Sequence, residues 1–177
     1  MHPHVPPRHT TNQPDRAPVE NRAYTGRRQP GSPPPLATRW GAVAVICRGD
    51  RLLVIRRAAT VEAPGTYCFP GGAIEPGESE QDALRRELRE ELGVDATPVR
   101  RIWQSITPWQ VDLRWWLAEL DPASQLQPNP AEVASAHWLT CREIRALPAL
   151  LTSNHHFLDA LERGALSMFR FHEGSPP

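Results

Sequence analysis

The chain has 177 residues, with 20 basic and 20 acidic side chains and a formal net charge of zero. This length suits one domain of ordinary size with a tail. The charge balance argues against a general nucleic-acid or anionic-membrane binder, which normally carries a basic excess. All 20 basic residues are arginine, so Schiff-base chemistry and a P-loop lysine are excluded.

The cysteines and the apolar runs indicate the compartment. Cys47, Cys68 and Cys141 form no C-x-x-C pair, which disfavours a zinc ribbon, a thioredoxin-like site and a disulfide framework. The longest apolar run, residues 40–47, is too short to span a membrane. Residues 1–35 contain no stretch typical of a secretory signal. We therefore expect a soluble, cytoplasmic protein without a membrane partner.

The first 37 residues differ in composition from the rest of the chain. Proline and arginine dominate them and apolar side chains are few. Such a segment buries too little surface to offset its ordering entropy. We expect a disordered tail at 1–37, a folded domain at 38–170 and a short tail at 171–177.

The folded part opens with a predicted hairpin. Residues 40–47 are typical of a buried strand, 48–51 of a tight turn, and 52–55 of the returning strand. A loop containing Pro64-Gly65 leads to a short strand at 66–69, which Pro70-Gly71-Gly72 should break.

Helices and strands then alternate. Leucines spaced by four, an N-cap Ser79 and a terminal Gly93 predict a helix over 79–92. Strands follow at 99–106, 111–119 and 137–139, with a polar loop at 125–130. A capping box at 140–143 starts a short helix that ends by Pro148, and a last helix covers 154–163. Helices before, between and after mixed strands predict an α/β fold with a sheet sandwiched by helices.

The helix at 79–92 carries an unusual group of carboxylates. Glu87, Glu90 and Glu91 lie at i, i+3 and i+4, so they share one face and repel one another. A partly buried cluster of this kind is unfavourable without a cation. Oxygen ligands alone select Mg²⁺, Mn²⁺ or Ca²⁺. The alternative is a solvated face of Glu/Arg pairs, since several arginines are nearby.

Arg86 and the two glycines before the helix extend this group. Arg86 stands four residues before Glu90 and could orient the carboxylates. Gly71 and Gly72 lack a Cβ, so their backbone can approach a metal or a phosphate closely.

The complete pattern over residues 72–94 resembles the Nudix box. The matching positions are Gly72, Glu78, Arg86, Glu87, Glu90, Glu91 and Gly93, with aliphatic Leu88 and Val94. The flanking Phe69-Pro70-Gly71 and Glu75-x-Gly77 also have the form that this family favours. The likeness to a Nudix hydrolase covers residues 38 to about 165 and leaves out the N-terminal tail.

The resemblance implies an α/β/α sandwich with a mixed sheet and a hydrolase that uses Mg²⁺ or Mn²⁺. The expected reaction cleaves the diphosphate of a nucleoside diphosphate linked to another group, such as an oxidised dNTP, ADP-ribose or NADH. Carried over by position, the metal ligands are Glu87, Glu90, Glu91 and the Gly71 carbonyl, and the catalytic residues are Glu87, Arg86 and Glu91. The general base is Glu87 in some members and a loop residue in others.

Residues outside the box select the substrate. Glu132 resembles the acidic residue that many Nudix proteins carry after the box, which implies an extra ligand or base. Arg39 and Arg56 could grip a phosphate or a base edge, and Trp109 could stack on a base. The alternatives are solubilising arginines and tryptophans of the core. On a strand, Trp115 and Trp116 point to opposite faces.

Two functional classes stay open. The first is the hydrolase, with a small nucleotide substrate and no stable nucleic-acid partner. The second is a catalytically silent Nudix-like module that binds a nucleotide as a sensor, although such modules usually lose box glutamates and this chain has all of them. The sequence leaves open whether the chain forms a homodimer, and which nucleotide is the physiological substrate.

Overall fold

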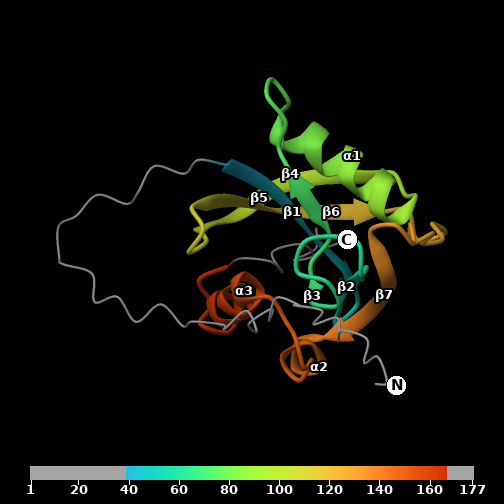
Figure 1. Cartoon of the computed structure of the whole chain (residues 1–177). Helices are drawn as coiled ribbons and strands as arrows, with labels where there is room; N and C mark the ends of the chain where they lie inside the picture. The colour runs from blue at the N-terminus through green and yellow to red at the C-terminus, as the bar shows by residue number, and fades with distance from the viewer. Residues whose placement is uncertain (1–38, 167–177) are drawn as a thin grey trace, which may run out of the picture. The chain divides into compact units, whose positions relative to one another are not determined.

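The computed structural model describes residues 39–166, and the predicted tails at 1–37 and 171–177 lie outside them. The described residues form a seven-stranded sheet with helices on its faces (Figure 1). The strands are β1 (Arg39–Arg48), β2 (Arg51–Arg57), β3 (Tyr67–Cys68), β4 (Gly71–Ala73), β5 (Ala96–Ile106), β6 (Val111–Leu120) and β7 (Val133–Thr140). The helices are α1 (Glu80–Leu92), α2 (Cys141–Arg145) and α3 (Thr152–Glu162).

The sheet is mixed because β1 runs parallel to β6, whereas its other pairings are antiparallel. The strand order is β3-β2-β1-β6-β5, with β4 added to β1 and β7 added to β2. β1 contacts β2 only beside the hairpin turn, at Cys47 and Arg48. Beyond that point β1 pairs with β4 and β2 pairs with β3 and β7, so the segment from β3 to β4 passes between the two arms.

Helix α1 covers one face of the sheet. Ser79 caps it by accepting from the Asp82 amide, and Gly93 ends it in the left-handed conformation, as predicted. Its buried leucines, Leu84, Leu88 and Leu92, pack on the alanines of β1 and β6. Each such side chain contributes about 1.5–3 kcal/mol by leaving water. This packing holds the glutamates of α1 beside β4.

Helix α3 covers the opposite face with an aromatic core. Phe157 stacks on Trp115 with ring centroids 4.7 Å apart and contacts Phe69 edge-on. Trp116 packs in the other core under α1, so the two adjacent tryptophans point to opposite faces as predicted. The α/β/α sandwich expected from the sequence is confirmed.

Some details differ from the predictions, among them the extents of β5 and β7, which begin at Ala96 and Val133 rather than at 99 and 137. Gly71 and Gly72 do not merely break a strand, because they form β4 against Val43 and Ala42. Helix α3 begins at Thr152, two residues earlier than expected, and its N-cap residue Leu151 makes no side-chain capping bond. All three cysteines are free. None of the helices within residues 39–166 is long and apolar enough to cross a membrane.

Candidate metal centre

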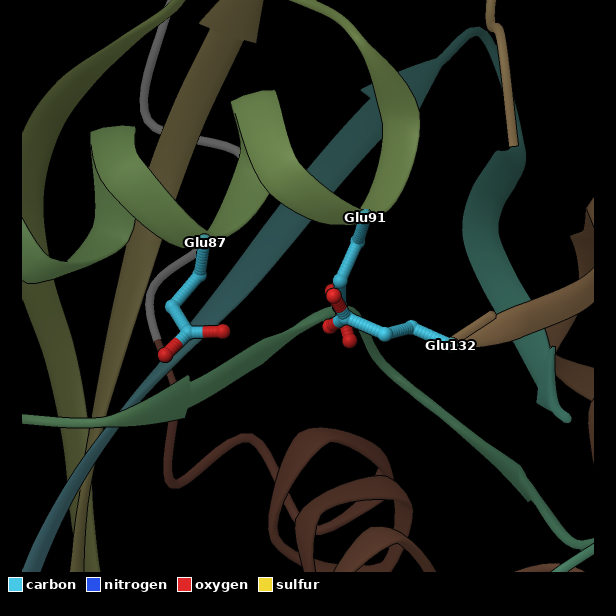
Figure 2. Close-up of side chains that lie close together, drawn as sticks. All are labelled: Glu87, Glu91 and Glu132. Atoms are coloured by element: carbon cyan, nitrogen blue, oxygen red, sulfur yellow. The ribbon is translucent and has the colours of Figure 1, made fainter. Parts of the chain in front are cut away.

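Three carboxylates from two distant parts of the chain meet at the edge of α1. Glu87 and Glu91 point away from the helix on the same side, and Glu132 reaches them from the segment before β7 (Figure 2). Each residue has an oxygen within 4.8 Å of an oxygen from each of the other two. The structure thus brings a box pair together with the downstream acidic residue singled out in the sequence.

Glu91 is the most deeply buried member, with 4% of its surface exposed. Its Oε2 accepts a hydrogen bond of 2.8 Å from the Gly71 amide. Burial raises the pKa of its carboxyl group to about 8, and the neighbouring carboxylates of Glu87 and Glu132 add to the rise, whereas the Gly71 amide and Arg57 oppose it. A carboxylate in this position is costly at neutral pH unless a cation compensates it.

Glu87 lies directly over Gly72. Any Cβ at position 72 would collide with the Glu87 carboxyl group, so a glycine is needed for this close approach. Burial raises the pKa of Glu87, while its hydrogen bond with Arg86 opposes the rise. The two adjacent glycines therefore have different roles: the Gly71 amide holds the Glu91 carboxylate, and Gly72 makes room for that of Glu87.

The loop before β7 is anchored to α1, and this places Glu132. The amides of Gln127 and Asn129 donate to the carbonyls of Leu92 and Glu91, at 2.7 and 2.9 Å. The Glu132 carbonyl in turn accepts from the Ala58 amide at 2.8 Å. Glu132 is thereby fixed opposite Glu91, although the two residues are far apart in the sequence.

Arg86 organises the carboxylates on the β4 side of α1. Its guanidinium donates to both oxygens of Glu78, to Glu87 and to Glu90, at 2.9 to 3.0 Å. A further bond of 2.8 Å to the Ala73 carbonyl ties it to β4. These bonds, above all those with Glu78, raise the pKa of Arg86, so it stays charged. The planar fork of an arginine is what allows so many simultaneous contacts.

The donor set fits a divalent cation. Opposite oxygen ligands of a cation bound at 2.0–2.6 Å are at most about 5 Å apart, which matches the spacing of the three carboxylates. Burial is the main cause of the raised pKa of Glu91, and a cation bound by the three carboxylates would oppose it by favouring the charged form. Oxygen-only ligands favour Mg²⁺, Mn²⁺ or Ca²⁺.

The other sequence-predicted ligands lie beside this group. Glu90 is outside it, with 49% of its side chain exposed and an ion pair to Arg86 of 3.0 Å. Gly71, whose carbonyl was the other predicted ligand, is the first residue of β4. Its amide donates to Glu91.

The three predicted substrate-binding residues lie on two different strands and in a turn. Arg39 opens β1 opposite Val111, and Trp109 is 68% exposed in the turn between β5 and β6. Arg56 lies on the other arm of the sheet, where its guanidinium is 5.9 Å from the Tyr67 ring centroid. Within residues 39–166, the hydrogen bonds and ring contacts join none of the three to another.

Arg57 is the residue near the centre that the sequence analysis missed. It lies close enough to Glu91 to lower the pKa of that carboxyl group. Its Nε donates to the Glu62 carbonyl at 2.7 Å, which fixes the loop after β2. The sequence contained a signal for this position. Side chains at every second residue of a strand point to the same face, so Arg57 shares the face of Leu53 and Ile55, which pack in the core under α1.

Comparisons with known proteins identify the family of this chain. Residues 37–161 match the NUDIX domain, and the chain belongs to this family. The NAD-capped RNA hydrolase NudC of Stutzerimonas stutzeri (strain A1501) is 35% identical over 107 residues, 60% of this chain and 38% of that protein. The CTP pyrophosphohydrolase of Escherichia coli (strain K12) is 48% identical over 54 residues, 30% of this chain and 40% of that protein. The matched part of this chain thus spans about two fifths of the length of each of these curated relatives.

A solved structure shows the same fold. The MutT protein from Methanosarcina mazei Go1 superimposes with a TM-score of 0.62 at 19% identity, covering 72% of this chain and 94% of that one.

Proposed function

We propose that residues 38–170 of this NUDIX-family chain hydrolyse the diphosphate linkage of a nucleoside diphosphate joined to another group, with a divalent cation. The observation that carries the proposal is the convergence of Glu87, Glu91 and Glu132 within 4.8 Å, with a glycine at position 72 that leaves room for Glu87. A solvated acidic face would not bury Glu91 or raise its pKa.

Glu87, Glu91 and Glu132 are the proposed ligands of Mg²⁺ or Mn²⁺, completed by Glu90 and the Gly71 carbonyl. Such a cation neutralises charge that develops on phosphate oxygens and lowers the pKa of a bound water. Mg²⁺ typically binds few carboxylates and keeps positions for water and substrate phosphate, which suits this set.

The surrounding residues hold these ligands still. The Gly71 amide fixes Glu91, and Arg86 fixes Glu87 and Glu90, so little reorganisation is needed during the reaction. Glu87 is the proposed general base, because it stands at the box position that serves as base in some members of the family. Glu132 is the alternative base, on a loop outside the box.

Arg39, Arg56 and Trp109 are the proposed substrate contacts. Arg56 has the best support, since it lines a surface pocket with Arg57 and Gly65 beside the loop that carries Glu132. The names of the relatives include a dinucleotide-capped RNA and a nucleoside triphosphate. We infer a substrate that contains a nucleoside diphosphate.

The test is product analysis with Mg²⁺ or Mn²⁺ and a substrate panel of CTP, oxidised dGTP, ADP-ribose, NADH and an NAD-capped oligonucleotide. Glu91→Gln is expected to lower turnover by orders of magnitude. Glu119→Gln is the matched control, because Glu119 is an exposed residue of β6. Metal binding without turnover of any compound would favour the silent sensor module, and equal turnover in both variants would refute the metal assignment.

A further inference from the structure

The segment Phe69-Pro70-Gly71 lies between α1 and α3 and is bonded to both helices through side chains. The Phe69 amide donates to Oδ1 of Asn154 on α3 at 2.9 Å. Two residues later, the Gly71 amide donates to Oε2 of Glu91 on α1 at 2.8 Å. Pro70 has no amide hydrogen. Every amide donor of this segment is therefore satisfied by a side chain rather than by a strand.

Asn154 is a buried polar side chain among apolar neighbours. Only 2% of its surface is exposed, and Phe157 and Leu158 of the same helix belong to the aromatic core. Its remaining contact is weaker, from Nδ2 to the Ser153 hydroxyl at 3.3 Å. A buried amide among apolar groups is costly, and the Phe69 bond is what compensates it here.

The rest of the segment is anchored by backbone contacts. On one side Tyr67 bonds to Ala149 and Leu151, and on the other the Pro70 carbonyl accepts from Ala44 at 2.9 Å. Between these anchors, the Phe69 amide depends on Asn154 alone among the described residues. Gly71 follows with a φ of +132°. The direction in which its amide points therefore depends on how Phe69 and Pro70 are held.

We propose that Asn154 is a positioning residue for the metal centre, acting through the Phe69–Gly71 segment on the carboxylate of Glu91. The consequence for metal affinity rests on the proposed function, whereas the link between Asn154 and the Gly71 amide stands on the geometry alone. Without the Asn154 acceptor, the Phe69 amide is left without a partner and the segment shifts. The Gly71 amide then no longer holds Glu91.

The test compares Asn154→Ala with Asn154→Asp in the full chain. Aspartate keeps an acceptor oxygen where Phe69 needs it, and alanine removes it. Ser153→Ala is the control, because it removes the other contact of Asn154 and leaves the Phe69 bond. The first readout is hydrogen exchange of the Gly71 amide by NMR, and the second is Mn²⁺ affinity by electron paramagnetic resonance.

We expect faster exchange at Gly71 and about tenfold weaker Mn²⁺ binding in Asn154→Ala, the size typical of lost outer contacts to a metal ligand. Asn154→Asp should restore slow exchange, and Ser153→Ala should behave as the unchanged chain. Unchanged Gly71 exchange in Asn154→Ala would overturn the proposal. So would uniformly faster exchange across the whole domain without rescue by aspartate, since that marks a general loss of stability. An unchanged chain that binds no Mn²⁺ would refute the proposed function, while the exchange experiment still decides this inference.

Discussion

Alanine at position 72 is expected to disable the proposed metal centre and leave the fold intact. A Cβ on Gly72 would lie well under 3.0 Å from the carboxyl atoms of Glu87, closer than real Cβ atoms come to other heavy atoms. The backbone at Gly72 does not have a positive φ, so it accepts an alanine. The side chain of Glu87 is flexible and therefore yields first.

The size of the effect follows from this geometry. The Glu87 carboxylate has to move by about 1 Å to reach ordinary contact, and a misplacement of that size costs about a hundredfold in rate. Replacing a glycine whose backbone accepts alanine changes the free energy of unfolding by only about 0.4–1 kcal/mol, in favour of the fold. We expect kcat to fall about a hundredfold, with a Tm within about 4 °C of the unchanged chain.

Gly71→Ala is the matched comparison, because it should lower the stability of the fold, which Gly72→Ala should not. Gly71 has a φ of +132°, and its Cβ would press on the backbone carbonyl of Ala42 in β1. The backbone conformation alone costs about 1–3 kcal/mol, and the adjacent strand cannot yield without losing its pairing with β4. This variant should therefore lose stability as well as activity.

Thermal unfolding and steady-state hydrolysis, measured on both variants, separate the two mechanisms. Mn²⁺ titration of Gly72→Ala then shows whether the loss lies in the metal centre. A Gly72→Ala variant with unchanged kcat would refute the role given to this glycine. An unchanged Tm in Gly71→Ala would refute the strain argument.

Three further predictions concern charge and capping. Burial raises the pKa of Glu91 to about 8 in the folded chain, against 4.5 for the ordinary group, so between these values only the folded state holds this proton. Without metal, the free energy of unfolding should therefore fall as pH rises from about 4.5 to 8 and level off above it. Thermal unfolding measured with a chelator across this pH range should show the fall. An equal fall in Glu91→Gln would show that another group is responsible. Arg86→Lys loses the planar fork that bonds both oxygens of Glu78 and reaches Glu87 and Glu90 at the same time. We expect turnover at least about tenfold lower with little change in Tm, and unchanged kinetics would show that the fork is unimportant. Thr140→Ala removes the capping box that starts α2. The free energy of unfolding should fall by about 1 kcal/mol and the Tm by about 2–4 °C, at unchanged turnover. A loss of turnover would link α2 to the metal centre.

The local elements were predictable because their signals lie within a few residues of one another. The N-cap Ser79, the leucines spaced by four and the terminal Gly93 all act within α1, and the structure places each as expected. The hairpin of β1 and β2 and the capping box of α2 are local for the same reason. The opposite directions of Trp115 and Trp116 follow from the twofold period of a strand.

The sequence alone thus determined which residues share a face and which helix carries the carboxylates. The box pattern depends on spacing along one helix, and spacing is preserved whatever the rest of the chain does. It also indicated Glu132, through a resemblance rather than through geometry.

Only the tertiary structure decided what surrounds those carboxylates. The bond between Phe69 and Asn154 joins residues 85 positions apart, and the one between Gly71 and Glu91 joins residues 20 apart. No local pattern specifies such pairs, because they depend on how the sheet places β4 beside α1 and α3 behind it. The same packing left Glu90 half exposed and buried Glu91, although the two are neighbours in the chain. Burial, which raises the pKa of Glu87 and Glu91, is a property of the folded chain and has no counterpart in the order of its residues.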